Sequence, residues 1–142
     1  MGAEVKLYKK LKAFTPQIIW IRIENLSLSG MPDLLGYNNS GRFFTVELKV
    51  TKGRKVRFSS HQIAWHVQHP KNSFILVQAL GPRTANRFQM FRGSRIMELD
   101  ACGLELTVLG PQPRIIFGRI PGHLMFSVYN TLSTSIPALS TI

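Results

Sequence analysis

Acidic residues are scarce in this chain, and so are cysteines and uninterrupted apolar runs. Only 7 of the 142 residues are Asp or Glu, against 18 Lys and Arg, which gives a formal net charge of +11. The single cysteine, Cys102, excludes an internal disulfide and a cysteine-rich zinc site. No apolar run is long enough to cross a bilayer, and the opening residues lack the apolar segment of a signal peptide. We therefore expect a soluble protein of a reducing compartment, the cytoplasm.

The composition is nevertheless that of a folded domain. Apolar residues make up 44% of the chain and charged residues 18%, so the chain can bury a core, and we expect residues 1–142 to form a single domain. A basic folded surface attracts polyanions, and nucleic acid is the leading partner. The rival is an anionic membrane surface, because residues 5–14 combine apolar residues at helical spacing with four lysines. For so short a helix, an apolar stripe on the core and a solvated basic face explain the pattern better.

The order of predicted elements indicates an α/β fold. We expect a helix over 5–14, strands over 17–24, 34–37 and 43–50, a helix over 61–69 and a strand over 73–80. The pattern is weaker in the second half of the chain, where we expect strands over 87–91, 104–109 and 114–119 and a helix over 94–101. The order α-β-β-β-α-β predicts a central mixed sheet flanked by helices.

Two of the few acids are placed to meet a lysine. Glu47 lies in the strand FFTVELKV, where the period of two puts Glu47 and Lys49 on the same face. The turn signal at 38–41 makes 34–37 and 43–50 the arms of a hairpin. In such a hairpin Asp33 arrives level with Glu47, give or take one residue. Two carboxylates and one ammonium group then converge.

This combination suits phosphodiester hydrolysis. Mg²⁺ takes oxygen ligands, typically one or two carboxylates with waters and substrate phosphate, so Asp33 and Glu47 are candidate metal ligands. An ammonium group beside the metal, here Lys49, offsets the charge that builds on the phosphorus. Taken alone, a Glu and a Lys two residues apart in a strand form a solvated face more often than a site. The proline and aspartate at the strand start, the hairpin length and the scarcity of other acids favour the functional interpretation.

The motifs carry a more specific resemblance. Gly30-Met31-Pro32-Asp33, Glu47-Leu48-Lys49 and then Gln62 at the start of a helix resemble the PD-(D/E)xK nuclease pattern. The pattern is most similar to the virus-type replication-repair nuclease (VRR-NUC) branch, whose small stand-alone members are similar to archaeal Holliday junction resolvases. The resemblance covers about residues 4–80, the motif-bearing core. It implies a restriction-endonuclease-like core and a Mg²⁺-dependent DNA endonuclease, with Mn²⁺ able to substitute.

The resemblance also assigns roles to residues. It makes Asp33 and Glu47 metal ligands with the backbone carbonyl of Leu48, Lys49 catalytic, and Gln62 a support for the site. The family places a further glutamate on the first helix, which would be Glu4. Glu24 is the competing third carboxylate, and an ion pair with Arg22 or Arg42 is an equally good account of it. Gln62 has a plainer interpretation as a helix-face amide bonded to solvent.

The resemblance favours branched DNA such as a four-way junction as the substrate. The alternatives are a non-catalytic nucleic-acid-binding protein on the same fold and an enzyme that cuts or nicks ordinary duplex. A small nuclease would also suit a phage, whose enzymes act in the host cytoplasm.

Basic residues follow the Glu-x-Lys motif and define the expected DNA-binding segment. The candidate phosphate contacts are Lys52, Arg54, Lys55, Arg57 and His61. We expect His66 and His69 to be surface or phosphate-contacting residues and Trp65 to be a core residue.

Residues 124–142 carry no charge, and the apolar cluster between Leu124 and Leu132 is a candidate dimerisation segment in an extension over about 120–142. A homodimer would suit the two symmetry-related strands of a junction. The other possibility is that this segment packs on its own core.

Overall fold

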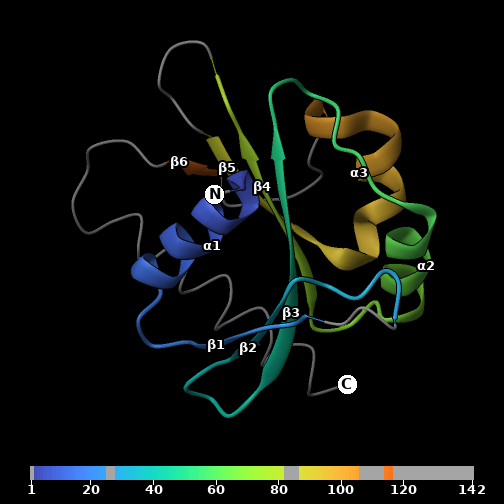
Figure 1. Cartoon of the computed structure of the whole chain (residues 1–142). Helices are drawn as coiled ribbons and strands as arrows, with labels where there is room; N and C mark the ends of the chain where they lie inside the picture. Colours follow the sequence, from blue (N-terminus) through green and yellow to red (C-terminus); the bar gives the residue numbers. More distant parts are fainter. Residues whose placement is uncertain (1, 25–27, 82–86, 106–113, 117–142) are drawn as a thin grey trace.

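A six-stranded mixed sheet with helices on both faces forms the centre of the molecule in the computed structural model (Figure 1). The structure describes residues 2–24, 28–81, 87–105 and 114–116. The elements, in chain order, are α1 (Ala3–Phe14), β1 (Ile19–Arg22), β2 (Leu34–Tyr37), β3 (Phe43–Thr51), α2 (Ser60–Gln68), β4 (Ser73–Ala79), β5 (Arg87–Arg92), the 3-10 turn η1 (Gly93–Arg95), α3 (Ile96–Cys102), the 3-10 turn η2 (Gly103–Glu105) and β6 (Arg114–Ile116). The predicted α/β architecture, an α-β-β-β-α-β order with a central mixed sheet flanked by helices, is confirmed.

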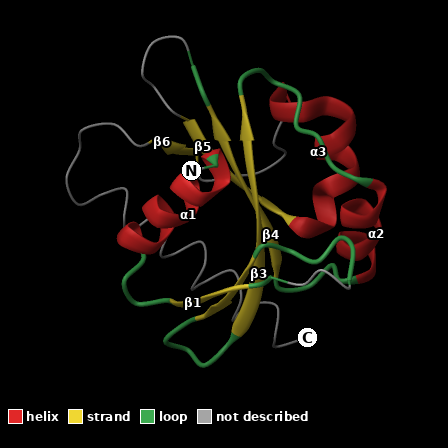
Figure 2. Cartoon of the chain, in the orientation of Figure 1, coloured by secondary structure: helices red, strands yellow, loops and turns green. Residues whose placement is uncertain are grey.

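The strands follow one another across the sheet in the order β1-β2-β3-β4-β5-β6. Among the described strands, β3 and β4 are the one parallel pair, and α2 makes the crossover between them; the other neighbours are antiparallel. Figure 2 shows α1 on one side of the sheet and α2 with α3 on the other. The parallel pair lies at the centre, where both of its faces can be covered.

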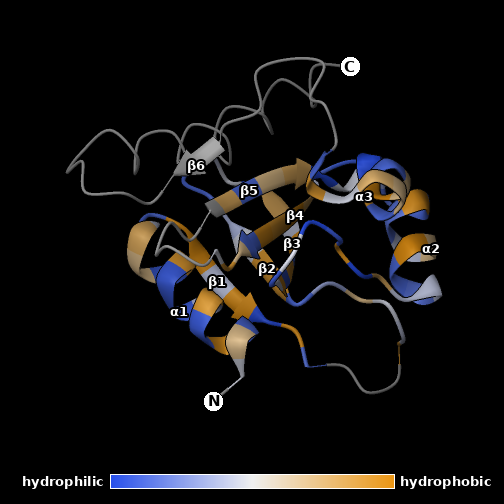
Figure 3. Cartoon of the chain, turned by 90° about the horizontal axis from the view of Figure 1, so that it is seen from above, coloured by the Kyte–Doolittle hydropathy of each residue, from blue (hydrophilic) through white to orange (hydrophobic). Residues whose placement is uncertain are grey.

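Helix α1 packs on the first face of the sheet through the stripe that its spacing predicts. Leu7 and Leu11 are buried against Trp20, Phe44 and other apolar residues of the strands. The ring of Trp20 meets Phe44 edge to face, with centroids 5.5 Å apart. In Figure 3 hydrophobic residues dominate much of the central sheet, whereas each helix shows hydrophobic and hydrophilic residues. Burial of one stripe therefore leaves the lysines of α1 at the surface.

The opposite face carries a second core beneath α2 and α3. Ile75 and Val77 of β4 pack there with Phe91, Ile96 and Leu99. Residues Phe44, Val46 and Leu48 of β3 point to the α1 side. Their neighbours Thr45, Glu47 and Lys49 therefore lie on the α2 side, as the period of two predicts.

The β2–β3 hairpin forms where the turn signal predicts it. The side chain of Asn38 is buried and its Oδ1 accepts hydrogen bonds from the N–H groups of Ser40 and Arg42. Gly41 supplies the positive φ of 76° that closes the turn. The resulting register pairs Leu34 with Val46, so the next residue out, Asp33, lies beside Glu47.

The prediction of a strand over 104–109 is wrong where the structure describes it. Residues Gly103–Glu105 form the 3-10 turn η2 instead. Gly103 has φ 60°, and the N–H of Leu104 donates to the carbonyl of Arg54 at 2.7 Å. This bond to the loop after β3 satisfies the backbone N–H of Leu104, so the residue needs no neighbouring strand. Residues 106–109 and 117–119 of the predicted strands lie outside the described residues, as does the candidate dimerisation segment between Leu124 and Leu132.

Candidate metal and catalytic site

The start of β2 and the strand β3 bring Asp33, Glu47 and Lys49 together at the middle of the sheet. The carboxylate oxygen Oδ2 of Asp33 accepts a hydrogen bond from the backbone N–H of Leu48 at 2.8 Å, which ties the start of β2 to β3. Lys49 Nζ lies 3.4 Å from Glu47 Oε1, within one strand. The hairpin register is the physical cause of this proximity, because it sets Asp33 opposite the Glu-x-Lys segment.

Gln62 joins Glu47 to Lys49. Its amide nitrogen Nε2 donates to Glu47 Oε1 at 2.5 Å, and its Oε1 accepts from Lys49 Nζ at 3.0 Å. Gln62 lies in the first turn of α2, where Ser59 caps the helix: Ser59 Oγ accepts from the N–H of Gln62, and Gln62 Oε1 accepts from the N–H of Ser59. The side chain of Gln62 thus contacts the site residues and is not simply solvated.

Glu47 is deeply buried for a carboxylate. Its residue exposure is 1%, and its second oxygen, Oε2, is buried without a hydrogen-bond partner in the part of the chain that the structure describes. Burial first, then the nearby Asp33 carboxylate, raises the pKa of Glu47 to about 8, although the Lys49 ammonium opposes the shift. A buried carboxylate oxygen without a donor is costly unless a positive group faces it. A cation at Glu47 would supply that charge.

Glu4 of α1 lines a cleft together with Asp33. Burial and the Asp33 carboxylate raise the pKa of Glu4, while Lys49 lowers it. Burial also raises the pKa of Asp33, against the Leu48 hydrogen bond and the charges of Lys49 and Arg22. Glu24 is exposed, as Glu4 is, and its Oε1 lies 3.6 Å from Arg22 Nε. Of the two candidates for a third carboxylate, Glu4 is thus the one that interacts electrostatically with Asp33 and Glu47.

Two clefts adjoin the cluster, and Glu4 lines both of them. The first, of about 240 Å³, is bounded by the start of α1 and by Tyr8, Arg22 and Asp33. The second, of about 370 Å³, is bounded by Lys49, Lys52, Lys55 and Arg57. Arg22 was predicted only as a partner of Glu24, although it stands opposite Leu34, next to Asp33, in the β1–β2 register.

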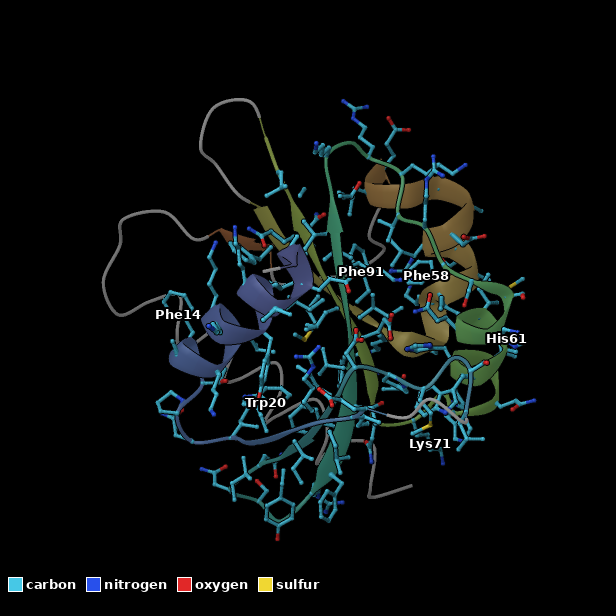
Figure 4. All side chains as sticks on the ribbon, viewed as in Figure 1. Phe14, Trp20, Phe58, His61, Lys71 and Phe91 are labelled. Atoms are coloured by element: carbon cyan, nitrogen blue, oxygen red, sulfur yellow. The ribbon has the colours of Figure 1, made fainter. Side chains whose placement is uncertain are left out.

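The basic loop after β3 divides into two parts. Lys52, Lys55 and Arg57 line the second cleft. Arg54 instead forms an ion pair with Glu105, and its carbonyl accepts from Leu104. His61 is exposed in the first turn of α2 (Figure 4).

The prediction that His66 is a surface residue is wrong. His66 is completely buried under α2, where its Nδ1–H donates to the carbonyl of Gln62 at 2.9 Å. Burial lowers the pKa of His66, although its hydrogen bond to the Gln62 carbonyl acts in the opposite direction. Gly93 makes room for it, since a Cβ there would come within 2.7 Å of the imidazole. His69 is exposed as predicted, and its ring stacks on the half-buried Trp65 at 4.3 Å.

Among the described residues, no three His, Cys, Asp or Glu side chains form a cluster that could hold a metal ion, and no helix is long and apolar enough to cross a membrane. The fold and the cluster define an α/β domain in which two strand-borne carboxylates, a lysine and a helix-borne amide meet beside basic clefts.

Comparison with protein-family models finds no match, and comparison with curated proteins finds none either. Among solved structures, the chain is similar to Hjc of Archaeoglobus fulgidus, described as a Holliday junction resolvase from an archaeal hyperthermophile. The two are 18% identical, the match covers 63% of this chain and 76% of that one, and the TM-score is 0.46.

Proposed function

We propose that this protein is a metal-dependent DNA endonuclease that hydrolyses phosphodiester bonds. The observation that carries the proposal is the buried, unpartnered Oε2 of Glu47, next to Asp33 and held in place by Lys49 and Gln62. A chain with few acids has gathered two carboxylates and a lysine from separate segments. The resemblance of these residues to the PD-(D/E)xK pattern supports the same chemistry.

The residues fit a hard divalent cation. Asp33, Glu47 and the Leu48 carbonyl are oxygen ligands of the kind that Mg²⁺ prefers, and Mn²⁺ would substitute. Asp33 Oδ2 is oriented by the Leu48 N–H, which leaves Oδ1 to face a cation. When bound, the cation would polarise the phosphoryl oxygen and lower the pKa of a bound water. Glu4 would stand at the rim of this ligand set.

The chain's own residues supply the remaining functions. Lys49 carries a positive charge next to the ligands and would stabilise the negative charge that develops on the phosphate oxygens. Gln62 would keep Lys49 and Glu47 at fixed positions, because its amide bonds to both. Lys52, Lys55 and Arg57 would hold the DNA backbone along the second cleft.

We further propose that the substrate is branched DNA and that the protein works as a homodimer. A junction presents two equivalent strands, and a second copy of the site would cut the second strand. Three large apolar residues, Ile19, Ile21 and Phe43, are more than half exposed on the β1–β3 part of the α2-side face. Such a face is of the kind that a second copy could cover.

The decisive experiment compares binding with cleavage. Labelled linear duplex, flap and four-way DNA are incubated with the protein in Mg²⁺ and in EDTA. We expect cleavage only in Mg²⁺, with the four-way DNA cut preferentially. Equal cutting of all forms would indicate a duplex-cutting or nicking enzyme, and binding without cutting would indicate a non-catalytic binding protein.

Substitutions in the same assay test the site assignment. Asp33→Asn or Glu47→Gln should lower cleavage at least about 100-fold, since even outer-shell partners of a metal cost 10 to 100-fold. DNA affinity in EDTA should stay the same or rise, because a carboxylate repels phosphate. Glu24→Gln, the same change in an exposed glutamate, should cleave like the unaltered protein. Mg²⁺-dependent cleavage by both site variants would contradict the assignment.

A further inference from the structure

The Lys49 ammonium has an aromatic neighbour that the motif does not include. Nζ lies 5.3 Å from the ring centroid of Phe58, in addition to its contacts with Gln62 and Glu47. Phe58 precedes Ser59, the N-cap of α2. Its ring is half-buried and packs against the core formed under α2 and α3, on that side of the sheet in Figure 4. The position of the ring is therefore fixed by packing that is independent of Lys49.

Ser59 fixes the other partner of Lys49. The Gln62 oxygen accepts from two donors, Lys49 Nζ and the Ser59 N–H at 3.0 Å, while the Gln62 amide nitrogen faces Glu47. A reversed amide would set its N–H groups against two donors and its oxygen against a carboxylate. The helix cap thus determines which end of the amide Lys49 meets.

Phe58 and Gln62 hold the ammonium in different ways. The amide oxygen accepts one N–H of Lys49, whereas the ring face attracts the positive charge without taking a proton. Only 17% of the Lys49 side chain is exposed, and it lines the second cleft. With Gln62 and Phe58 on two sides, the Lys49 ammonium still has an N–H group that can donate a hydrogen bond into the second cleft.

We propose that Phe58 and Ser59 form a clamp that positions Lys49 for the reaction, with Phe58 as the positioning residue that acts directly on the ammonium. The proposal rests on the proposed function for its catalytic consequence. The clamp itself is a geometric property of the metal-free chain.

Ring-current shifts test the geometry without any cleavage assay. The ¹Hε and ¹³Cε resonances of Lys49, assigned by their loss in Lys49→Arg, are recorded for the full chain and for Phe58→Leu and Phe58→Tyr. We expect the ¹Hε resonance to lie upfield in the original protein, to move toward the random-coil position in Phe58→Leu and to be kept in Phe58→Tyr. Lys10, whose Nζ lies 5.7 Å from the Phe88 ring, is the internal control and should not move. Unchanged Lys49 resonances in Phe58→Leu would overturn the clamp.

Cleavage under single-turnover conditions tests its consequence. Phe58→Leu should slow cleavage about tenfold with unchanged DNA affinity in EDTA. Phe58→Tyr, which keeps an aromatic ring, should cleave at the original rate. An equal loss of affinity would mean that Phe58 contacts DNA, and would overturn the positioning role. If the original protein cuts no DNA at all, the proposed nuclease fails, while the resonances still decide whether the clamp exists. Thermal melting of both variants establishes that they are folded.

Discussion

At the residue scale, Glu47 shows how far burial alters an ordinary side chain. A glutamate in a strand is usually solvated, but Glu47 has 1% exposure and shares its site with Asp33. Both effects disfavour its ionised form, so the metal-free site resists carrying the negative charges that a cation needs. Ionisation of Glu47 therefore costs free energy in the metal-free protein, and a bound cation would offset this cost.

A pH dependence of stability follows for the metal-free protein. The pKa of Glu47 is about 8 in the folded state, above its ordinary value of 4.5. The contribution of Glu47 to the free energy of unfolding should therefore be greatest below pH 4.5. It should be lost as the pH rises from 4.5 through 8, by at most about 5 kcal/mol. Glu47→Gln should remove this fall. Thermal melting of both proteins in EDTA between pH 4.5 and 9 measures the difference.

The control uses the same two proteins with Mg²⁺. The ion should raise the melting temperature of the original protein more at pH 8.5 than at pH 6, because protons compete with it for Glu47. Glu47→Gln should gain little at either pH. Parallel melting curves for the two proteins across the whole pH range in EDTA would contradict the burial argument.

At the element scale, the first turn of α2 organises the site. Its cap positions Gln62, and Gln62 bonds to Glu47 and Lys49. The loop that leads to Asp33 packs closely against the backbone of His61 at Gly30. Gly30 makes that last contact possible: it has φ 87°, and a Cβ there would lie 2.3 Å from the carbonyl oxygen of His61. One helix end thus aligns the proposed metal ligands Asp33 and Glu47.

Gly30→Ala should separate the Asp33 loop from α2. The added Cβ has no space and the backbone conformation is unfavourable for alanine, so we expect a loss of about 1–3 kcal/mol in the free energy of unfolding. Cleavage should fall as well, because Asp33 shifts. Gly53→Ala is the matched control, since a Cβ there has no neighbour within 4 Å, and should leave both quantities unchanged. Denaturant unfolding and single-turnover cleavage measure the two effects. If Gly30→Ala and Gly53→Ala have the same free energy of unfolding and the same cleavage rate, the close packing of the Gly30 loop on α2 does not matter for the site.

At the scale of the whole molecule, the net charge of +11 is not uniformly available for DNA. Lys55 lines the cleft beside the site, whereas Arg54, its neighbour in the chain, is paired with Glu105. Exposed ion pairs are weak, but this pair turns the Arg54 side chain toward η2 and lowers the local charge. Position in the fold therefore separates two adjacent basic residues.

Salt dependence should distinguish the two residues. Lys55→Ala should weaken binding to duplex, flap and four-way DNA alike and reduce the slope of log K against log salt by about 0.9, the value for one lost phosphate contact on duplex. Arg54→Ala, which removes the same charge, should leave the slope nearly unchanged. Fluorescence anisotropy at several salt concentrations in EDTA supplies the values. Equal changes of slope in the two variants would place Arg54 on the DNA as well.

The sequence by itself determined the elements that depend on local chemistry. Alternation in FFTVELKV put Glu47 and Lys49 on one face, the Asn-Asn-Ser-Gly turn set the hairpin, and together they predicted the approach of Asp33. These inferences succeeded because strand period and turn geometry act over a few residues. β1 begins later than the predicted strand over 17–24, because the N–H of Ile18 donates to the carbonyl of Thr15 in a turn just before it.

Only the tertiary structure decided which distant residues meet. Helical spacing could not reveal that His66 is buried, because that depends on the space left by Gly93 in another segment. The pairing of Arg54 with Glu105, the position of Glu4 near Asp33, and the contact of Phe58 with Lys49 likewise join segments through packing. Burial of Glu47, and with it the pKa near 8, arises from the same packing, since a strand pattern specifies a face but not what covers it.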